Sequence, residues 1–204
     1  MYVPASFLQS DRQVLTGFIG QNSFGLLVSR SGDEPFATHL PLLFDPSAGE
    51  HGHLLGHFAR ANPQWRELRG QQVLAIFSGP HAYVSPTWYG VPNMVPTWNY
   101  LAVHVYGRCE LVEDEASLLE LLTETARTYE RSLPTPWTFD RDNPQIGKML
   151  KAIVGFRIEV SRIEGKWKLG QNHSPGMREN VVAELSVSKD PEARAIAALM
   201  AETL

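Results

Sequence analysis

Short runs rich in apolar residues recur along this chain, and over residues 156–163 apolar and polar positions alternate, which is the pattern of a strand with one buried face. Gly, Pro, Asp and Ser residues separate these runs, as turns and loops require. The chain is therefore predicted to be rich in β-structure. The expected strands cover residues 24–29, 36–44, 53–59, 73–77, 82–84, 97–106, 108–113 and 156–163.

Helical spacing of apolar residues occurs in shorter stretches between and after these strands. Ser10 and Gln13 fit a capping box at the start of a helix that reaches Ile19. Asp114 is a suitable N-cap for a leucine-rich helix that ends near Arg131. Two further helices are expected over 144–153, beginning at Pro144, and after Asp190–Pro191.

Six or more strands, followed late in the chain by helices, favour an antiparallel β-barrel with peripheral helices, a mainly β (α+β) fold. The loop over 132–143 contains two Pro residues but is too short to mark a domain boundary. We therefore expect a single domain over 1–204, with a C-terminal helical extension over about 178–204.

Composition narrows the classes of function. The chain has 204 residues, 43% of them hydrophobic and 20% charged, as in an ordinary globular protein. Its 18 basic and 22 acidic residues give a formal net charge of −4, and no dense Lys/Arg block occurs. Because nucleic-acid binding depends on a basic surface, DNA is a possible partner that the charge does not support.

The single cysteine, Cys109, excludes an internal disulfide and fits a reducing compartment. It lies in a strand-like stretch, where a small buried thiol is a better interpretation than a nucleophile. No apolar run has the length of a membrane span, and the first residues lack the pattern of a signal peptide. The expected location is the cytoplasm.

An aromatic run between Ile76 and Gly107 is the strongest functional signal. Trp88, Tyr89, Trp98 and Tyr100 could stack on a planar ring. Donors and acceptors accompany them at Ser85, Thr97 and Asn99, and strand alternation places the last two on the face opposite Trp98. The run fits a ligand site, and it fits a hydrophobic core or dimer interface equally well.

The segment GHFARANPQW, residues 56–65, carries a second candidate site. Arg60 comes at the end of a predicted strand that also holds His57, and its guanidinium could bind a phosphate in bidentate fashion. Asn62 and Pro63 would begin a short helix, whose unpaired amides also favour an anion. The alternative is a structural strand-to-helix corner with a surface arginine.

A third candidate is EGKWKLGQN, residues 164–172. Lys166 and Lys168 share one strand face, and Gln171 and Asn172 follow in a loop. These groups could bind a phosphate or polarise a flavin carbonyl. The alternative is an edge strand whose lysines discourage unwanted pairing.

The sequence HGHLLGH, residues 51–57, has three histidines, but few carboxylates and no cysteine lie near it. A histidine-rich turn is favoured over a metal site, so no metal is predicted. The chain has no Walker loop, no dinucleotide-binding glycine pattern and no nucleophile elbow. No residue stands out as a catalytic acid or base.

Six motifs in order resemble the PaiB-type FMN-binding proteins, a family described as negative transcriptional regulators. They are ATHLPLLFD, GHFARANPQW, GPHAYVSPTWY, VPTWNYLAVHVYG, IVGF and EGKWKLGQN, which together extend the resemblance from Met1 to about Asn172. The resemblance implies a split β-barrel related to pyridoxamine-phosphate oxidases, and a homodimer that holds FMN between its subunits. It also implies a transcriptional regulator or flavin-linked sensor, with a flavin-dependent oxidoreductase as the alternative.

The same resemblance implies which residues bind the cofactor. Arg60 would lie near the flavin phosphate, and the other matched positions would lie near the cofactor or the dimer seam. Two positions depart from the family pattern: Gly170 stands where Ser is usual, and Gly90 where Pro is common. The complete predicted set is His57, Arg60, Asn62, Ser85, Trp88, Thr97, Trp98, Asn99, Lys166, Lys168, Gln171 and Asn172.

Overall fold

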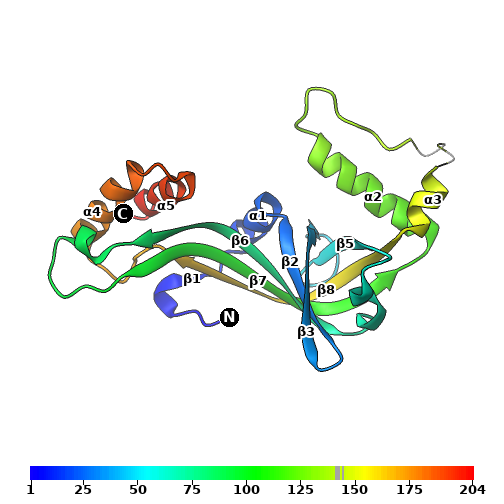
Figure 1. Ribbon diagram of the computed structural model, residues 1–204, viewed down its shortest axis with the longest axis horizontal. Coiled ribbons are helices and arrows are strands. Elements are labelled where there is room, and N and C mark those ends of the chain that lie inside the picture. The colour runs from blue at the N-terminus through cyan, green and yellow to red at the C-terminus, as the bar shows by residue number, and fades with distance from the viewer. Residues whose placement is uncertain (141–142, 144) are drawn as a thin grey trace. The chain divides into compact units, whose positions relative to one another are not determined.

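The computed structural model describes residues 1–140, 143 and 145–204 (Figure 1). The strands are β1 (Leu8–Gln9), β2 (Phe24–Ser31), β3 (Glu34–Pro41), β4 (Leu43–Asp45), β5 (His53–Ala59), β6 (Gln72–Val84), β7 (Thr97–Val112) and β8 (Ile153–Lys168). The α-helices are α1 (Arg12–Gln21), α2 (Glu115–Glu130), α3 (Ile146–Lys151), α4 (Pro175–Ser186) and α5 (Pro191–Ala201). Three short 3-10 helices are η1 (Ala5–Phe7), η2 (Pro63–Glu67) and η3 (Pro86–Tyr89).

Across the described residues, eight strands form one sheet in the order β3-β2-β6-β7-β8-β5-β4, and β1 pairs with β8. The registered pairs of β2 with β3 and β6, of β5 with β4 and β8, and of β1 with β8 are antiparallel. The prediction of a mainly β, antiparallel fold with peripheral helices is confirmed.

The chain divides into two compact units. Unit 1 comprises residues 1–18, 77–104 and 164–204, and unit 2 comprises 19–76 and 105–163. The long strands β6, β7 and β8 contribute residues to both units. The expectation of a single domain stays a prediction.

In unit 1, helices α4 and α5 lie side by side near the C-terminus (Figure 1). Val181 and Leu185 of α4, with Ile196 and Ala197 of α5, are buried. The predicted α5 is confirmed, and Asp190 is its N-cap, accepting from the Glu192 amide at 3.0 Å. Helix α4 was not predicted as a separate helix, because its sequence gives only a weak apolar stripe, although the helical extension expected over about 178–204 covers most of it.

In unit 2, the core consists of large apolar side chains from the strands, among them Leu27, Leu54, Phe58, Phe156 and Ile158. A second cluster joins Leu118 of α2 to Ile146 and Leu150 of α3. Helix α2 agrees with its prediction, since Asp114 accepts from the Ser117 amide at 2.9 Å. Helix α3 falls inside the range expected, and Pro144, where that helix was expected to begin, lies outside the described residues.

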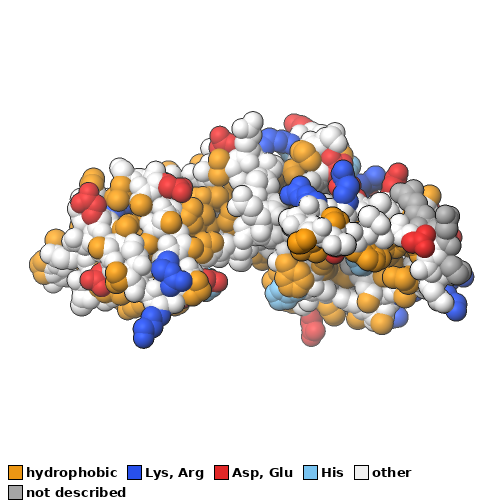
Figure 2. Space-filling view, turned by 90° about the horizontal axis from the view of Figure 1, so that it is seen from above, with side chains coloured by type: hydrophobic (Ala, Val, Ile, Leu, Met, Phe, Trp, Pro, Cys, Tyr) orange, Lys and Arg blue, Asp and Glu red, His pale blue; other side chains and the backbone are white. Residues whose placement is uncertain are grey.

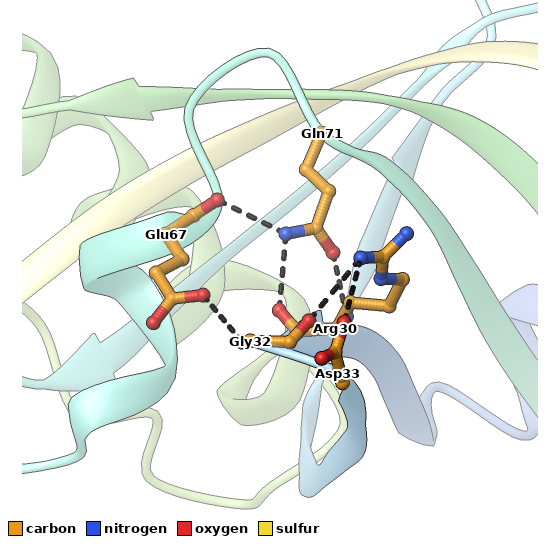
Figure 3. Close-up of polar contacts among 5 residues, drawn as sticks. All are labelled: Arg30, Gly32, Asp33, Glu67 and Gln71. Carbon is orange, nitrogen blue, oxygen red and sulfur yellow. Dashed lines mark hydrogen bonds and ion pairs between the residues drawn. The ribbon is translucent and has the colours of Figure 1, made fainter.

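Within unit 2, the Gln71 side chain links the β2–β3 hairpin to η2 by hydrogen bonds (Figure 3). Its side chain accepts from the Arg30 amide at 2.6 Å and donates to the Arg30 and Glu67 carbonyls, each at 3.0 Å. The Glu67 carboxylate accepts from the Gly32 amide at 2.8 Å, and Arg30 lies 3.8 Å from Asp33 at the turn. Because these groups satisfy one another, we interpret the cluster as structural.

Several predicted boundaries were wrong. Strand β6 runs without a break through Ser78, Gly79 and Pro80, because its registered pairs with β2 end at Ile76 and the missing Pro80 amide interrupts none of them. Strand β7 likewise continues through Gly107. A Cβ there would lie 2.2 Å from the Glu159 carbonyl oxygen, so this glycine permits close strand packing instead of a turn.

Two local predictions near the N-terminus also need correction. The first turn of α1 is capped by Asp11 and not by the Ser10–Gln13 capping box: Asp11 Oδ1 accepts from the Gln13 amide at 2.8 Å and the Val14 amide at 3.1 Å. The strand predicted over 36–44 is divided at Leu42, whose amide donates to the Ser23 carbonyl at 2.8 Å.

In the part of the chain that the structure describes, none of the helices has the length and apolar character needed to cross a bilayer.

Candidate functional site

Unit 1 contains a cavity of about 220 Å³. Its wall combines apolar side chains with one cation, one imidazole and several carboxamide or hydroxyl groups. This is the mixture expected of a site that holds a mainly apolar ligand in one orientation. The lining residues are Phe7, Tyr89, Met94, Val95, Thr97, Asn99, Lys168, Gly170, Asn172 and His173.

Strand β7 brings Thr97 and Asn99 to the cavity because residues two apart share a strand face. Asn99 is only 2% exposed, and its Nδ2 donates to the Met200 sulfur at 3.3 Å. Trp98, between them, faces the other way and is 52% exposed. Its ring lies 5.9 Å from both the His81 and Tyr83 rings, and it does not line the cavity.

Lys168, the last residue of β8, supplies the cation. Its Nζ donates to Thr97 Oγ1 and, at 2.6 Å, to the Trp98 carbonyl. Burial lowers the pKa of Lys168, and the neighbouring positive charge of Lys166 lowers it further. A negatively charged ligand would relieve both effects.

Lys166 has a different environment. It is 8% exposed, donates to the Tyr2 carbonyl at 3.2 Å, and lies over the Tyr2 and Tyr100 rings at 5.6 and 5.2 Å. These contacts hold the N-terminal segment against the sheet of unit 1. Lys166 does not line the cavity.

The turn after β8 presents Gly170 and Asn172 to the cavity. Gly170 has φ +76°, a left-handed conformation that glycine adopts without strain. Gln171 does not line the cavity. Its side chain accepts from the Leu169 amide at 2.8 Å and donates to the Trp167 carbonyl at 2.7 Å, so it shapes the turn.

His173 is a cavity residue that the sequence prediction missed. Its ring lies 4.8 Å from that of Tyr89, and its Nε2 lies 3.4 Å from Asn172 Nδ2. Burial lowers the pKa of His173, and the charge of Lys168 adds to the effect. The sequence could have indicated His173, because it directly follows Gln171 and Asn172, which were predicted to bind the cofactor.

Ser85 directly precedes η3 and Trp88 lies within it, and neither residue lines the cavity. Ser85 is the N-cap of η3, accepting from the Thr87 amide at 3.3 Å, and Trp88 donates from its amide to the Ser85 carbonyl at 3.2 Å. Gly90, with φ +70°, ends η3 in a conformation closed to the proline common in the family. This helix positions Tyr89 in the wall.

His57, Arg60 and Asn62 lie in unit 2. Arg60 donates from Nε to the Lys151 carbonyl at 2.9 Å and from Nη2 to the Ile153 carbonyl at 2.8 Å. Asn62 caps η2 through the Gln64 amide at 3.0 Å and donates to Thr38 Oγ1 at 2.9 Å. Burial lowers the pKa of His57. Arg60 and Asn62 therefore stabilise a strand-to-helix corner, and the predicted short helix after Asn62 is confirmed.

The structure thus places nine of the twelve predicted residues in unit 1 and three in unit 2. Within unit 1, four of the nine line one cavity: Thr97, Asn99, Lys168 and Asn172. Cofactor binding by the twelve residues stays a prediction.

Cys109 confirms the interpretation of a buried thiol. It is fully buried, and burial raises the pKa of its thiol to about 12, which leaves it protonated and unreactive at neutral pH.

A larger cavity of about 450 Å³ lies in unit 2 between α2 and the sheet. Its apolar floor includes Leu121 and Phe156, and its rim carries Glu120, Glu124 and Arg157. Glu124 is already paired with Arg127 at 2.8 Å. None of the predicted site residues lines it.

Comparisons with known proteins agree with the motifs. The family model described as "Putative FMN-binding domain" matches residues 1–162. The chain is 40% identical over 206 residues to "Protease synthase and sporulation protein PAI 2" of Bacillus subtilis, covering 100% of this chain and 98% of the relative.

Two flavoprotein structures are similar in fold at low identity. The flavocytochrome Anf3 of Azotobacter vinelandii has a TM-score of 0.61 at 15% identity, covering 93% of this chain and 75% of that one. The FAD and heme binding protein of Mycobacterium smegmatis has a TM-score of 0.60 at 12% identity, covering 93% and 96%. They confirm the predicted flavin-binding type of split barrel. The family match and the full-length relative together establish that the chain belongs to the PaiB-type FMN-binding family and that FMN is its cofactor.

Proposed function

We propose that the protein is a homodimeric FMN-binding regulator or flavin-linked sensor, and that the cavity of unit 1 receives part of the FMN. The observation that carries the proposal is the convergence of Lys168, Asn99, Asn172 and Thr97 on one largely apolar cavity.

The chemistry of these side chains fits the ring of a flavin. The polar edge of that ring is an imide with two carbonyl acceptors and one N–H donor, and a carboxamide offers the complementary donor and acceptor. Lys168 would lie near a carbonyl oxygen, and Phe7 and Tyr89 would contact the apolar part of the ring. FMN supplies electron-transfer chemistry, and the residues of the chain bind and orient it.

The size of the cavity supports a dimer. At about 220 Å³ it is smaller than the ~300 Å³ at the lower end of sites for drug-sized ligands. It would therefore hold only part of FMN, and a second subunit would cover the rest. Large apolar side chains of unit 1 are available for such a contact: Val95 is 71%, Trp98 52% and Tyr83 45% exposed.

A regulatory role is supported by the relative from Bacillus subtilis, whose name assigns it to protease synthesis and sporulation. On the face shown in Figure 2, Lys and Arg side chains form small groups with Asp and Glu among them. The net charge of −4 points the same way. We therefore propose that regulation does not depend on a broad DNA-binding surface.

A flavin-dependent oxidoreductase is the second candidate, and His173 is the observation that favours it. A neutral imidazole in the same cavity as Lys168 could exchange a proton with a small substrate.

The proposal is tested by purifying the protein, releasing its ligand by denaturation and identifying it by chromatography, while light scattering gives the mass. We expect FMN at one per subunit and a mass of twice 22.8 kDa. Lys168→Gln should lower FMN occupancy, and Lys189→Gln, which replaces an exposed lysine of unit 1, should not. A colourless monomer with no affinity for added FMN would refute the proposal.

The two functions are separated by adding NADH or NADPH to the FMN-loaded protein. Rapid bleaching of the flavin, with reoxidation by a small-molecule acceptor, would establish the oxidoreductase. Slow or absent bleaching, together with altered protease expression in a deletion strain, would establish the regulator.

A further inference from the structure

The cavity of unit 1 is electrostatically unbalanced. Two of its lining residues, Lys168 and His173, carry basic groups, and no carboxylate is among the described residues that line it. Among the described residues, Lys168 donates hydrogen bonds to two neutral acceptors, Thr97 Oγ1 and the Trp98 carbonyl. A basic pair that is partly removed from water and lacks an acidic partner is the environment that a negatively charged ligand would stabilise.

The described groups that η3, β8 and α4 bring near His173 are neutral or cationic. The Tyr89 ring of η3 lies 4.8 Å from the His173 ring at an interplanar angle of 50°, and burial raises the pKa of the Tyr89 phenol, which keeps it neutral. Lys168, at the end of β8, is close enough for its charge to lower the pKa of His173, and the charge of Lys166 in turn lowers the pKa of Lys168. From α4, Arg178 lies across Gly170, and its guanidinium donates to the carbonyls of Thr203 at 2.7 Å and Met200 at 3.2 Å.

These surroundings keep His173 neutral near pH 7 when the cavity contains no charge. An anion placed beside Lys168 would reverse the balance, because an opposite charge at short range favours the imidazolium form. The ring is held in position for this response by Tyr89 on its face and Asn172 at Nε2.

We propose that the unit 1 cavity is a proton-coupled anion site: a negatively charged group binds beside Lys168, and His173 takes up a proton from solvent as it enters. The proposal rests on the proposed function only in taking FMN as one source of the charge, in which case its phosphate, and not the edge of its ring, occupies the cavity beside Lys168. A separate small oxyanion bound next to the flavin is the other source. The Tyr89 ring and the carboxamide of Asn172 act as positioning groups.

Calorimetric titration in two buffers of different ionisation enthalpy, at pH 7, counts the protons taken up. If the phosphate of FMN is the charge, the wild type takes up as much as one proton more than His173→Gln on binding FMN, and the two proteins do not differ on binding riboflavin. If the charge belongs to a separate ligand, the two proteins do not differ with either flavin, and they differ when inorganic phosphate is added to the riboflavin-loaded form. Either result supports the site, and equal proton uptake by the two proteins in both arms overturns it.

His173→Gln identifies the residue that takes up the proton. The ligand phosphate titrates near the same pH, so both proteins share that contribution and their difference belongs to His173. Wild-type affinity should fall as pH rises between the pKa values of the unliganded and liganded imidazole, by at most tenfold per pH unit. The variant should lack this component, and an unchanged pH profile would overturn the assignment.

NMR titration of the histidine ring in the unliganded protein gives a test that does not depend on flavin. Lys168→Gln removes the nearby positive charge and should raise the pKa of His173, whereas Lys189→Gln should leave it unchanged. Equal pKa values in all three proteins would overturn the proposed coupling. Normal FMN binding with no His173 response would reject this inference and leave the proposed function standing.

Discussion

Two regions of the molecule contain similar polar side chains but place them in different surroundings. Residues 57–64 of unit 2 and 166–173 of unit 1 each follow or end a strand and each carry a cationic side chain beside carboxamides. In unit 2 the donors of Arg60 face main-chain carbonyls, and Asn62 caps a helix. In unit 1 Lys168 and Asn172 line a cavity.

The difference shows that the role of a cationic side chain depends more on the groups around it than on whether it is an arginine or a lysine. The carbonyl groups of Lys151 and Ile153, which lie at an exposed and a half-buried position, accept the two hydrogen bonds that Arg60 donates. Lys168 donates one hydrogen bond to the main chain, at the Trp98 carbonyl, and it lines the cavity together with Asn172. The comparison therefore predicts that the corner stabilises the fold and the cavity binds the ligand.

The largest expected effect comes from Gln64, the centre of the corner. This residue is 2% exposed, accepts from Thr38 Oγ1, and donates to Ser29 Oγ and to the carbonyls of Leu27 and Phe36. Gln64→Leu should lower the free energy of unfolding by about 3 kcal/mol, because several buried polar groups lose their partner. Urea denaturation measures the loss, and Gln72→Leu, at an exposed site, is the control. Loss of FMN affinity without loss of stability would place the corner in the binding site.

Arg60→Met tests the comparison directly. Loss of two charge-assisted hydrogen bonds to carbonyls should cost about 2 kcal/mol of stability, with FMN affinity in the folded protein nearly unchanged. Arg66→Met is a matched control, because both arginines lie over the Trp65 ring, at 5.6 and 6.0 Å. A tenfold weaker FMN affinity at unchanged stability would instead support the phosphate role that the sequence predicts for Arg60.

The two lysines of β8, Lys166 and Lys168, give a contrast within one strand. Lys168→Gln should weaken FMN binding by about tenfold, roughly 1.4 kcal/mol, with little change in stability. Lys166→Gln should retain FMN affinity and lose about 1 kcal/mol of stability, because its contacts are the Tyr2 and Tyr100 rings. Flavin fluorescence quenching and thermal unfolding measure the pair. Reversed effects would mean that the cavity does not hold the cofactor.

The smallest effect is expected at Gly170. Gly170→Ala places a Cβ 3.8 Å from the nearest side-chain atoms, so no clash follows. The left-handed backbone, φ +76°, should still cost about 1 kcal/mol. Gly170→Ser should cost the same and show by its FMN affinity whether the hydroxyl usual in the family adds a contact. A Tm equal to that of the wild type would show that the turn relaxes.

By itself the sequence determined the elements whose signal is local. Strand β5 was predicted with its observed bounds, and the caps at Asp114 and Asp190 marked the starts of α2 and α5. The ordered motifs identified the family and its cofactor. Alternation also placed Thr97 and Asn99 on one face, which the cavity confirms. The strand, cap and alternation signals depend on neighbouring residues alone, and each family motif is itself a short local segment.

Only the tertiary structure decided the features that depend on distant partners. Pro80 and Gly107 interrupt neither β6 nor β7, because strand pairing and the close approach of β8 set those boundaries. His173 joins the cavity because Tyr89, 84 positions earlier, packs against its ring. Arg60 and Lys168 look alike as candidate cations in the sequence. The carbonyls and the cavity that distinguish them are assembled from segments far apart along the chain.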